Sequence, residues 1–204
     1  VLAHRAGRRG DALQLVRNAL SHAPDNTACL NTLGFLLRLD QKYQDAEAAL
    51  SRAIALKADY ADAHNNLGIV YAESGDPTRA EASYREALKH RPEFPEAHSN
   101  LGNLLYRMGR LDDAVAAYEA ATTLRPDYAE AYVNQGDAYF NKGDTDNALT
   151  AYKKAVDAAP EWANGWYKLA NALYQMDQFD RAVLAYQRCV DLNPNQPRSL
   201  TNLG

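Results

Sequence analysis

Apolar residues recur along the chain with helical spacings that alternate between two short segments. The first segment follows the i, i+3, i+4, i+7 spacing of one helix face; its members are His64, Leu67, Gly68 and Tyr71. The second segment marks another helix face; its members are Ala80, Tyr84, Ala87 and Leu88. The pattern therefore predicts two amphipathic helices separated by a short polar turn.

These positions return every 34 residues through the whole chain. The glycine position recurs as Gly34, Gly68, Gly102, Gly136, Ala170 and Gly204. The aromatic position of the second helix recurs as Val16, Leu50, Tyr84, Tyr118, Tyr152 and Tyr186. A fixed period of this length is typical of repeat proteins, in which each unit buries its apolar face against its neighbours. The chain is therefore predicted to be a helical repeat protein.

Polar residues and glycines predict where the helices begin and end. Gly75, Gly109 and Gly143 occur where a left-handed residue would close the first helix of a repeat. We expect the second helix to begin at an aspartate N-cap, at Asp112, Asp146 and Asp180. Thr78 with Glu81 has the spacing of a capping box. Proline ends most repeats and Pro95 suits a first helical position.

The repeat resembles the tetratricopeptide repeat (TPR) family. The residues that carry the resemblance are His64-x-x-Leu67-Gly68-x-x-Tyr71, Ala80-x-x-x-Tyr84, Pro92, and Trp166 with Leu169. The resemblance covers essentially the whole chain, and it departs from the family pattern at Gln135, Ala170 and Ala58. It implies an all-α fold, a right-handed superhelical solenoid of antiparallel helix-turn-helix TPR units.

The family's repeat start gives a single TPR array over residues 1–204. Five full repeats are expected at 27–60, 61–94, 95–128, 129–162 and 163–196, with partial repeats at 1–26 and 197–204. Both ends of the sequence fall inside a first helix, and Leu200 and Leu203 would be exposed there. Two interpretations follow, a fragment of a longer array or a chain that stacks end to end with further copies.

The resemblance places the first helix of each repeat on the concave side of the solenoid, where a groove binds partners. Removing the buried face of each first helix leaves the groove-facing set. These candidate residues are Asn65, Asn66, Ile69, Asn100, Asn103, Tyr106, Arg107, Asn134, Asp137, Phe140, Asn141, Tyr167, Lys168, Asn171 and Tyr174. Amides pair with the backbone of an extended peptide, and aromatic rings offer rigid apolar area. The set predicts a protein or peptide partner.

Two known binding modes of the family can be compared with this set. The column Asn66, Asn100 and Asn134 is similar to the asparagine ladder of protein O-GlcNAc transferases, which holds a substrate backbone. This likeness keeps open the alternative that the chain recruits substrates for a larger enzyme such as a glycosyltransferase. A clamp for chaperone tails needs lysines, but Ser99 and Asn164 stand at those places.

Composition narrows the function further. The net charge of −4 gives no basic surface for nucleic acid. No run of residues is long and apolar enough to predict a membrane span, and the sequence lacks a P-loop. His64 and His98 share the column of Trp166 and Tyr132, which indicates packing instead of a metal site. We therefore expect no cofactor, no metal and no catalytic residue in this chain.

Overall fold

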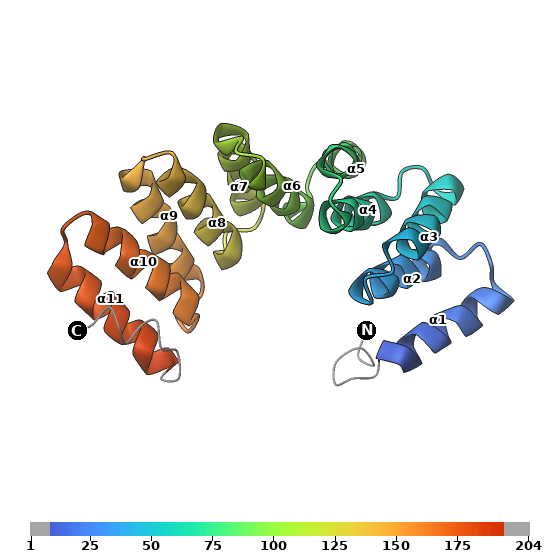
Figure 1. Ribbon diagram of the computed structural model, residues 1–204, viewed down its shortest axis with the longest axis horizontal. Helices are drawn as coiled ribbons and strands as arrows, with labels where there is room; N and C mark the ends of the chain where they lie inside the picture. The colour runs from blue at the N-terminus through green and yellow to red at the C-terminus, as the bar shows by residue number, and fades with distance from the viewer. Residues whose placement is uncertain (1–8, 194–204) are drawn as a thin grey trace. The chain divides into compact units, whose positions relative to one another are not determined.

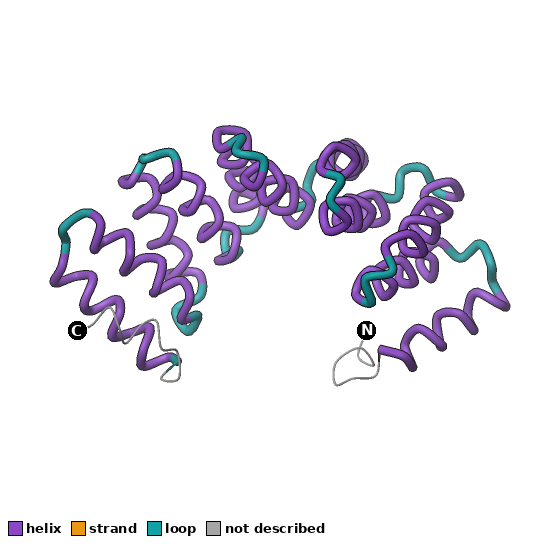
Figure 2. The backbone as a smooth tube through the Cα atoms, viewed as in Figure 1, coloured by secondary structure: helices purple, strands orange, loops and turns teal. Residues whose placement is uncertain are grey.

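The computed structural model describes residues 9–193, and every regular element in that range is an α-helix (Figures 1 and 2). The expected partial repeat at 197–204 lies outside the described residues, as do residues 1–8. The helices are α1 (Arg9–His22), α2 (Thr27–Leu39), α3 (Tyr43–Leu56), α4 (Ala61–Ser74), α5 (Pro77–His90), α6 (Pro95–Arg107), α7 (Leu111–Leu124), α8 (Ala129–Asn141), α9 (Thr145–Ala158), α10 (Ala163–Gln175) and α11 (Phe179–Leu192). The all-α repeat fold is thereby confirmed.

The helices form antiparallel pairs within two compact units. The first compact unit is Val1–Asn100 and the second is Leu101–Gly204, so that the division falls inside α6. In the first unit α2 packs against α3, and α4 packs against α5. In the second unit the pairs are α8 with α9 and α10 with α11. A helix begins at Thr27, Ala61, Pro95, Ala129 and Ala163, one period of 34 residues apart each time.

The turn inside each pair has the same backbone form in all five described repeats. Gly75, Gly109 and Gly143 have φ values of 89°, 75° and 80°, as the left-handed turn requires. Gln41 and Asp177 occupy the same repeat position with φ of 58° and 56°. The left-handed conformation is therefore set by the helix pair, and two repeats adopt it without glycine.

The expected N-caps of the second helices were wrong by two residues. The aspartates that cap are Asp76, which accepts from the Arg79 backbone N–H at 3.0 Å, and Asp144, which accepts from the Asn147 N–H at 3.2 Å. Each cap directly follows the left-handed glycine, because that residue completes the turn. The predicted caps Asp112, Asp146 and Asp180 lie in the first helical turn, where a carboxylate still favours the helix dipole.

The recurring glycine of the first helix makes room for the aromatic residue of the second. A Cβ atom on Gly68 would lie 2.6 Å from the Tyr84 ring, and one on Gly136 would lie 2.5 Å from the Tyr152 ring. Both rings are buried. The close approach explains why this position, in the middle of a helix, carries a residue that weakens isolated helices.

Replacing Gln41 with glycine is expected to stabilise the first compact unit by about 1 kcal/mol. The left-handed conformation costs a residue with a side chain about 1–2 kcal/mol, and glycine avoids this cost. The gain is smaller than the full cost because glycine loses more conformational entropy on folding. Thermal unfolding followed by circular dichroism would measure the change. Asp177→Gly is the matched variant and should gain less, since aspartate tolerates this conformation better. An unchanged or lower melting temperature in Gln41→Gly would contradict the expectation.

Candidate functional site

The asparagine column forms hydrogen bonds between successive first helices. In the first compact unit, Asn66 Nδ2 donates to Asn31 Oδ1 at 2.8 Å. Asn100 Nδ2 then donates to Asn65 Oδ1 at 2.9 Å. Each amide therefore contacts the preceding repeat, a role that was not anticipated when the column was interpreted only as a ligand-facing surface.

The same column continues in the second compact unit with a change of chemistry. Asn134 Nδ2 donates to Asn103 Oδ1 at 3.0 Å. One repeat later Lys168 Nζ stands in the place of the asparagine, and it pairs with both carboxylate oxygens of Asp137 at 2.9 and 2.8 Å. The neutral amide pair is thus replaced by an ion pair of the same connectivity. We call these two donor–acceptor pairs the inter-repeat bonds.

Buried tyrosines hold the acceptors of these bonds in place. Tyr118 Oη donates to Asn103 Oδ1 at 2.7 Å, and Tyr152 Oη donates to Asp137 Oδ1 at 2.6 Å. Burial and, second, the charge of Asp137 raise the pKa of the Tyr152 hydroxyl above its ordinary value. Because the hydroxyl stays protonated, it remains a donor. Tyr186 makes the equivalent bond to Asn171 Oδ1 at 2.6 Å.

The aromatic row follows the same surface in the second unit. Tyr106 and Phe140 are half-buried, and Tyr174 is 54% exposed. Asn141 Nδ2 donates to the Tyr106 hydroxyl at 2.5 Å, which joins α6 to α8 at this edge. Arg107 is exposed at the end of α6. Rings, amides and a guanidinium therefore lie on the first helices α6, α8 and α10 of the second compact unit.

The structure places nearly all of the predicted site residues at accessible positions. The half-buried ones are Asn66, Ile69, Asn100, Asn103, Tyr106, Asn134, Asp137, Phe140, Tyr167, Lys168 and Asn171. The exposed ones are Arg107, Asn141 and Tyr174. Asn65 is a correction: only 7% of it is exposed, because it lies between repeats, where it accepts from Asn100. Helical spacing within one repeat predicted that Asn65 is exposed, because it takes no account of the first helix of the next repeat, which covers this residue.

The histidine and tryptophan column connects the first helices α4, α6 and α10 to the linker that precedes each of them. Nε2 of His64 lies 2.9 Å from the Ala58 carbonyl oxygen, and Nε2 of His98 lies 2.9 Å from that of Pro92. Trp166 Nε1 donates to the Pro160 carbonyl at 2.8 Å. These bonds give the histidines a structural role. Among residues 9–193, no group of three metal-ligating side chains could hold an ion.

A second recurring contact in the linkers was missed in the sequence. A cation lies over an aromatic ring three residues later, at 5.2 Å for Lys57 over Tyr60 and 4.7 Å for Arg125 over Tyr128. Arg91 lies 3.6 Å from the Phe94 ring centroid in the same way. The sequence did contain the signal, because a cation is followed three residues later by an aromatic residue near the end of three successive repeats.

Comparisons with known proteins agree with this architecture. Models of the tetratricopeptide repeat match residues 26–93, 65–122, 99–161 and 163–196. The repeated helix pairs define a helical-repeat protein. The chain belongs to the tetratricopeptide repeat family. Within its described residues no helix has the length and apolarity that crossing a membrane requires.

Several solved structures share the fold at low sequence identity. MamA is 22% identical with a TM-score of 0.73, covering 81% of this chain and 97% of MamA. YrrB, described as a TPR protein with an unusual peptide-binding site, is 20% identical with a TM-score of 0.71, covering 94% and 98%. Pseudomonas aeruginosa PilF is 22% identical with a TM-score of 0.77, covering 85% and 79%. A comparison with curated proteins gave no match.

Proposed function

We propose that the chain is a protein–protein interaction scaffold that binds a peptide segment of a partner on the first-helix surface of the second compact unit. This surface consists of α6 from Leu101 onward, α8 and α10. TPR proteins are in general interaction modules without catalytic activity. A TPR neighbour with a peptide-binding site, YrrB, supports the same class of function.

The observation that carries the proposal is the polar capacity left after the inter-repeat bonds are formed. The Asn134 side chain uses one N–H toward Asn103, and among the described residues it has no other side-chain hydrogen bond. Its second N–H and its carbonyl oxygen are therefore available, the donor and acceptor that a peptide backbone needs. Asn171 accepts from Tyr186 and keeps its amide donors.

The aromatic row supplies the apolar part of the same surface. Phe140 and Tyr174 lie one repeat apart on α8 and α10, and Arg107 adds a cation at the end of α6. Aromatic and arginine side chains are the residues that most often dominate binding energy at interfaces. A bound segment would therefore place its backbone along the amides and its side chains against the rings.

The test is a triple variant that removes these contacts and leaves the inter-repeat bonds intact, Arg107→Ala/Phe140→Ala/Tyr174→Ala. Affinity capture from a cell lysate, with mass spectrometry, should lose the partner of the wild-type chain, with affinity at least about tenfold weaker. The matched control, Thr123→Ala/Asp157→Ala, changes exposed residues on the second helices and should keep the partner. Equal capture by the triple variant, with an unchanged circular dichroism spectrum, would assign binding to another surface.

A further inference from the structure

In two repeats a tyrosine at the same position of the first helix binds a carboxylate on the preceding second helix. In the first compact unit Tyr71 Oη donates to Glu47 Oε1 at 2.8 Å, from α4 to α3. In the second unit Tyr139 Oη donates to Glu119 Oε1 at 2.8 Å, from α8 to α7. Glu119 stands one helical turn beyond the repeat position of Glu47. We call each of these contacts a phenol–carboxylate pair, and both units therefore contain one.

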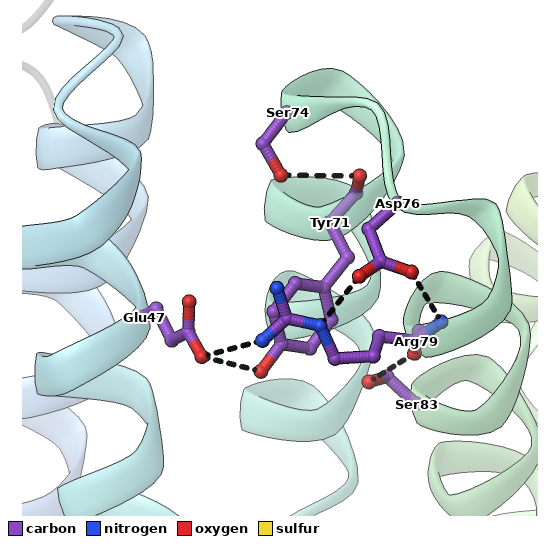
Figure 3. A network of polar contacts seen from close by, with 6 residues as sticks. All are labelled: Glu47, Tyr71, Ser74, Asp76, Arg79 and Ser83. Atoms are coloured by element: carbon purple, nitrogen blue, oxygen red, sulfur yellow. Dashed lines mark hydrogen bonds and ion pairs between the residues drawn. The ribbon is translucent and has the colours of Figure 1, made fainter.

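In the first unit an arginine of the chain itself completes the pair. Figure 3 shows Arg79 of α5, whose Nη1 donates to Glu47 Oε1 at 3.0 Å and whose Nε donates to Asp76 Oδ2 at 2.6 Å. Its central carbon lies 4.2 Å from the Tyr71 ring centroid. The contact does not fill the groove, because a pocket of about 540 Å³ remains beside it. A guanidinium therefore meets both the carboxylate and the phenol ring of the pair, which suits a planar cation.

In the second unit the repeat position of Arg79 carries no guanidinium. Asn147 stands there, and its Nδ2 donates to the N-cap Asp144 Oδ2 at 2.7 Å, so that it extends no further across the groove. Beside Tyr139 a pocket of about 180 Å³ opens between α7, α8 and α9. Small-molecule sites usually measure about 300–1,000 Å³, so this pocket suits the end of one side chain. Its lining residues are Glu119, Gln135, Tyr139, Asn147, Thr150, Ala151 and Lys154.

The carboxylate of this pocket keeps its charge and lacks a counter-ion. Burial and, second, the hydrogen bond to Glu119 raise the pKa of the Tyr139 hydroxyl to about 12, so the phenol stays neutral and remains a donor. Lys142 pairs with an aspartate of α7, and Lys154 Nζ lies 5.7 Å from the Tyr132 ring centroid. Lys154 thus balances the charge of the pocket as a whole, but Glu119 forms no ion pair within the described residues.

The floor of the pocket is a buried amide in a column of leucines. Gln135 stands where the other repeats have leucine, and only 8% of it is exposed. A buried carboxamide costs stability unless its polar atoms are hydrogen-bonded. Its N–H side acts as a donor on the Tyr139 hydroxyl. Its carbonyl oxygen accepts no side-chain hydrogen bond within the described residues, so a donor that enters the pocket supplies the missing partner.

We propose that the pocket between α7, α8 and α9 is a docking site for an arginine side chain of a partner protein. Arg79 in the first unit shows the chemistry that a phenol–carboxylate pair accepts. In the pocket the partner's guanidinium bonds Glu119 and lies against the Tyr139 ring, and a further N–H reaches the Gln135 carbonyl oxygen. Arginine has five donors in one plane and can make these contacts together, whereas lysine is a point charge. No residue of the proposed peptide surface lines the pocket, so the two sites are independent.

The test uses phage-displayed random peptides selected on the whole chain after depletion on Asn147→Arg. This variant gives α9 the arginine that α5 has, so its own guanidinium occupies the pocket and depletion removes peptides that bind elsewhere. We expect an enriched family with one arginine in common. Glu119→Gln keeps an acceptor for Tyr139 but removes the charge, and it should weaken a synthetic peptide of this family about tenfold. The matched control is Glu47→Gln, the same change at the pair that Arg79 already completes, and it should leave the affinity unchanged.

The sign of the charge effect and the location are tested with the same peptide. Lys154→Gln should strengthen binding about twofold, because it removes a like charge from the pocket. The triple variant of the peptide surface should bind the arginine peptide with unchanged affinity, so that failure of one proposal leaves the other standing. Absence of an arginine family, unchanged affinity in Glu119→Gln, or weaker binding in Lys154→Gln would overturn the assignment. Equal weakening in Glu47→Gln would overturn it as well, since it would move the site to the first compact unit.

Discussion

Gly136→Val is expected to destabilise the second compact unit by about 3 kcal/mol, the cost of overpacking a close helix contact. A Cβ atom at residue 136 would lie 2.5 and 2.7 Å from two carbons of the Tyr152 ring. The ring has no room to retreat, because Tyr152 is buried and its hydroxyl is bonded to Asp137. Valine adds two further carbons at this point, so the helices must move apart.

Another repeat of the chain shows how much side chain this glycine position tolerates. Ala170 occupies the glycine position of the repeat that starts at Ala163, opposite the buried Tyr186. One carbon is therefore tolerated where the neighbouring ring is placed for it. Gly136→Ala should cost less than valine, about 1 kcal/mol, since alanine also gains about 1 kcal/mol of helix propensity.

Both tryptophans, Trp162 and Trp166, belong to the second compact unit, so their fluorescence reports on it selectively. Urea unfolding followed by this signal gives the change without assuming that the whole array unfolds in one step. We expect the free energy of unfolding to be lowest for Gly136→Val, higher for Gly136→Ala and highest for the wild type. A valine variant as stable as the wild type would mean that the contact at Tyr152 is loose in solution.

The helices were predictable from the sequence because they depend on contacts within one repeat. Gly68 and Tyr84 recur together at a fixed spacing, and the contact between them lies within one helix pair. The turn glycine at residue 75 was likewise predictable, because glycine adopts the left-handed conformation of this turn at the lowest cost, although Gln41 and Asp177 adopt it as well. The N-caps were misread because a carboxylate in the first turn and one at the cap have similar sequence signals.

The surface was harder to predict because it depends on contacts between repeats. The position of Asn65 relative to its own helix suggests exposure, and only the neighbouring Asn100 shows that it is covered. The column comparison did contain one clue. Lys168 breaks the asparagine column where Asp137 breaks the column of Asn103, and paired changes of this kind indicate a contact. The roles of these residues combine inter-repeat packing with the binding proposed above.

Asp137→Leu is the second large expected effect, a loss of about 2–4 kcal/mol in the second compact unit. Asp137 accepts from the Tyr152 hydroxyl and from Lys168, both within 2.9 Å. Leucine leaves a buried hydroxyl without its acceptor, which costs about 1–3 kcal/mol. It also leaves Lys168 without its counter-charge, and since both side chains of that pair are partly exposed, at 32% and 24%, this adds about 1 kcal/mol at most.

The double variant Asp137→Asn/Lys168→Asn separates the geometry of this contact from its charge. It rebuilds at α8–α10 the neutral bond that Asn134 and Asn103 form one repeat earlier, with Tyr152 still donating to residue 137. We expect it to lie within about 1 kcal/mol of the wild type, whereas Lys168→Met alone leaves a carboxylate unpaired and costs more. Tryptophan fluorescence in urea compares all four chains. If the double variant were as unstable as Asp137→Leu, the ion pair itself, and not the shared hydrogen-bond pattern, would hold α8 and α10 together.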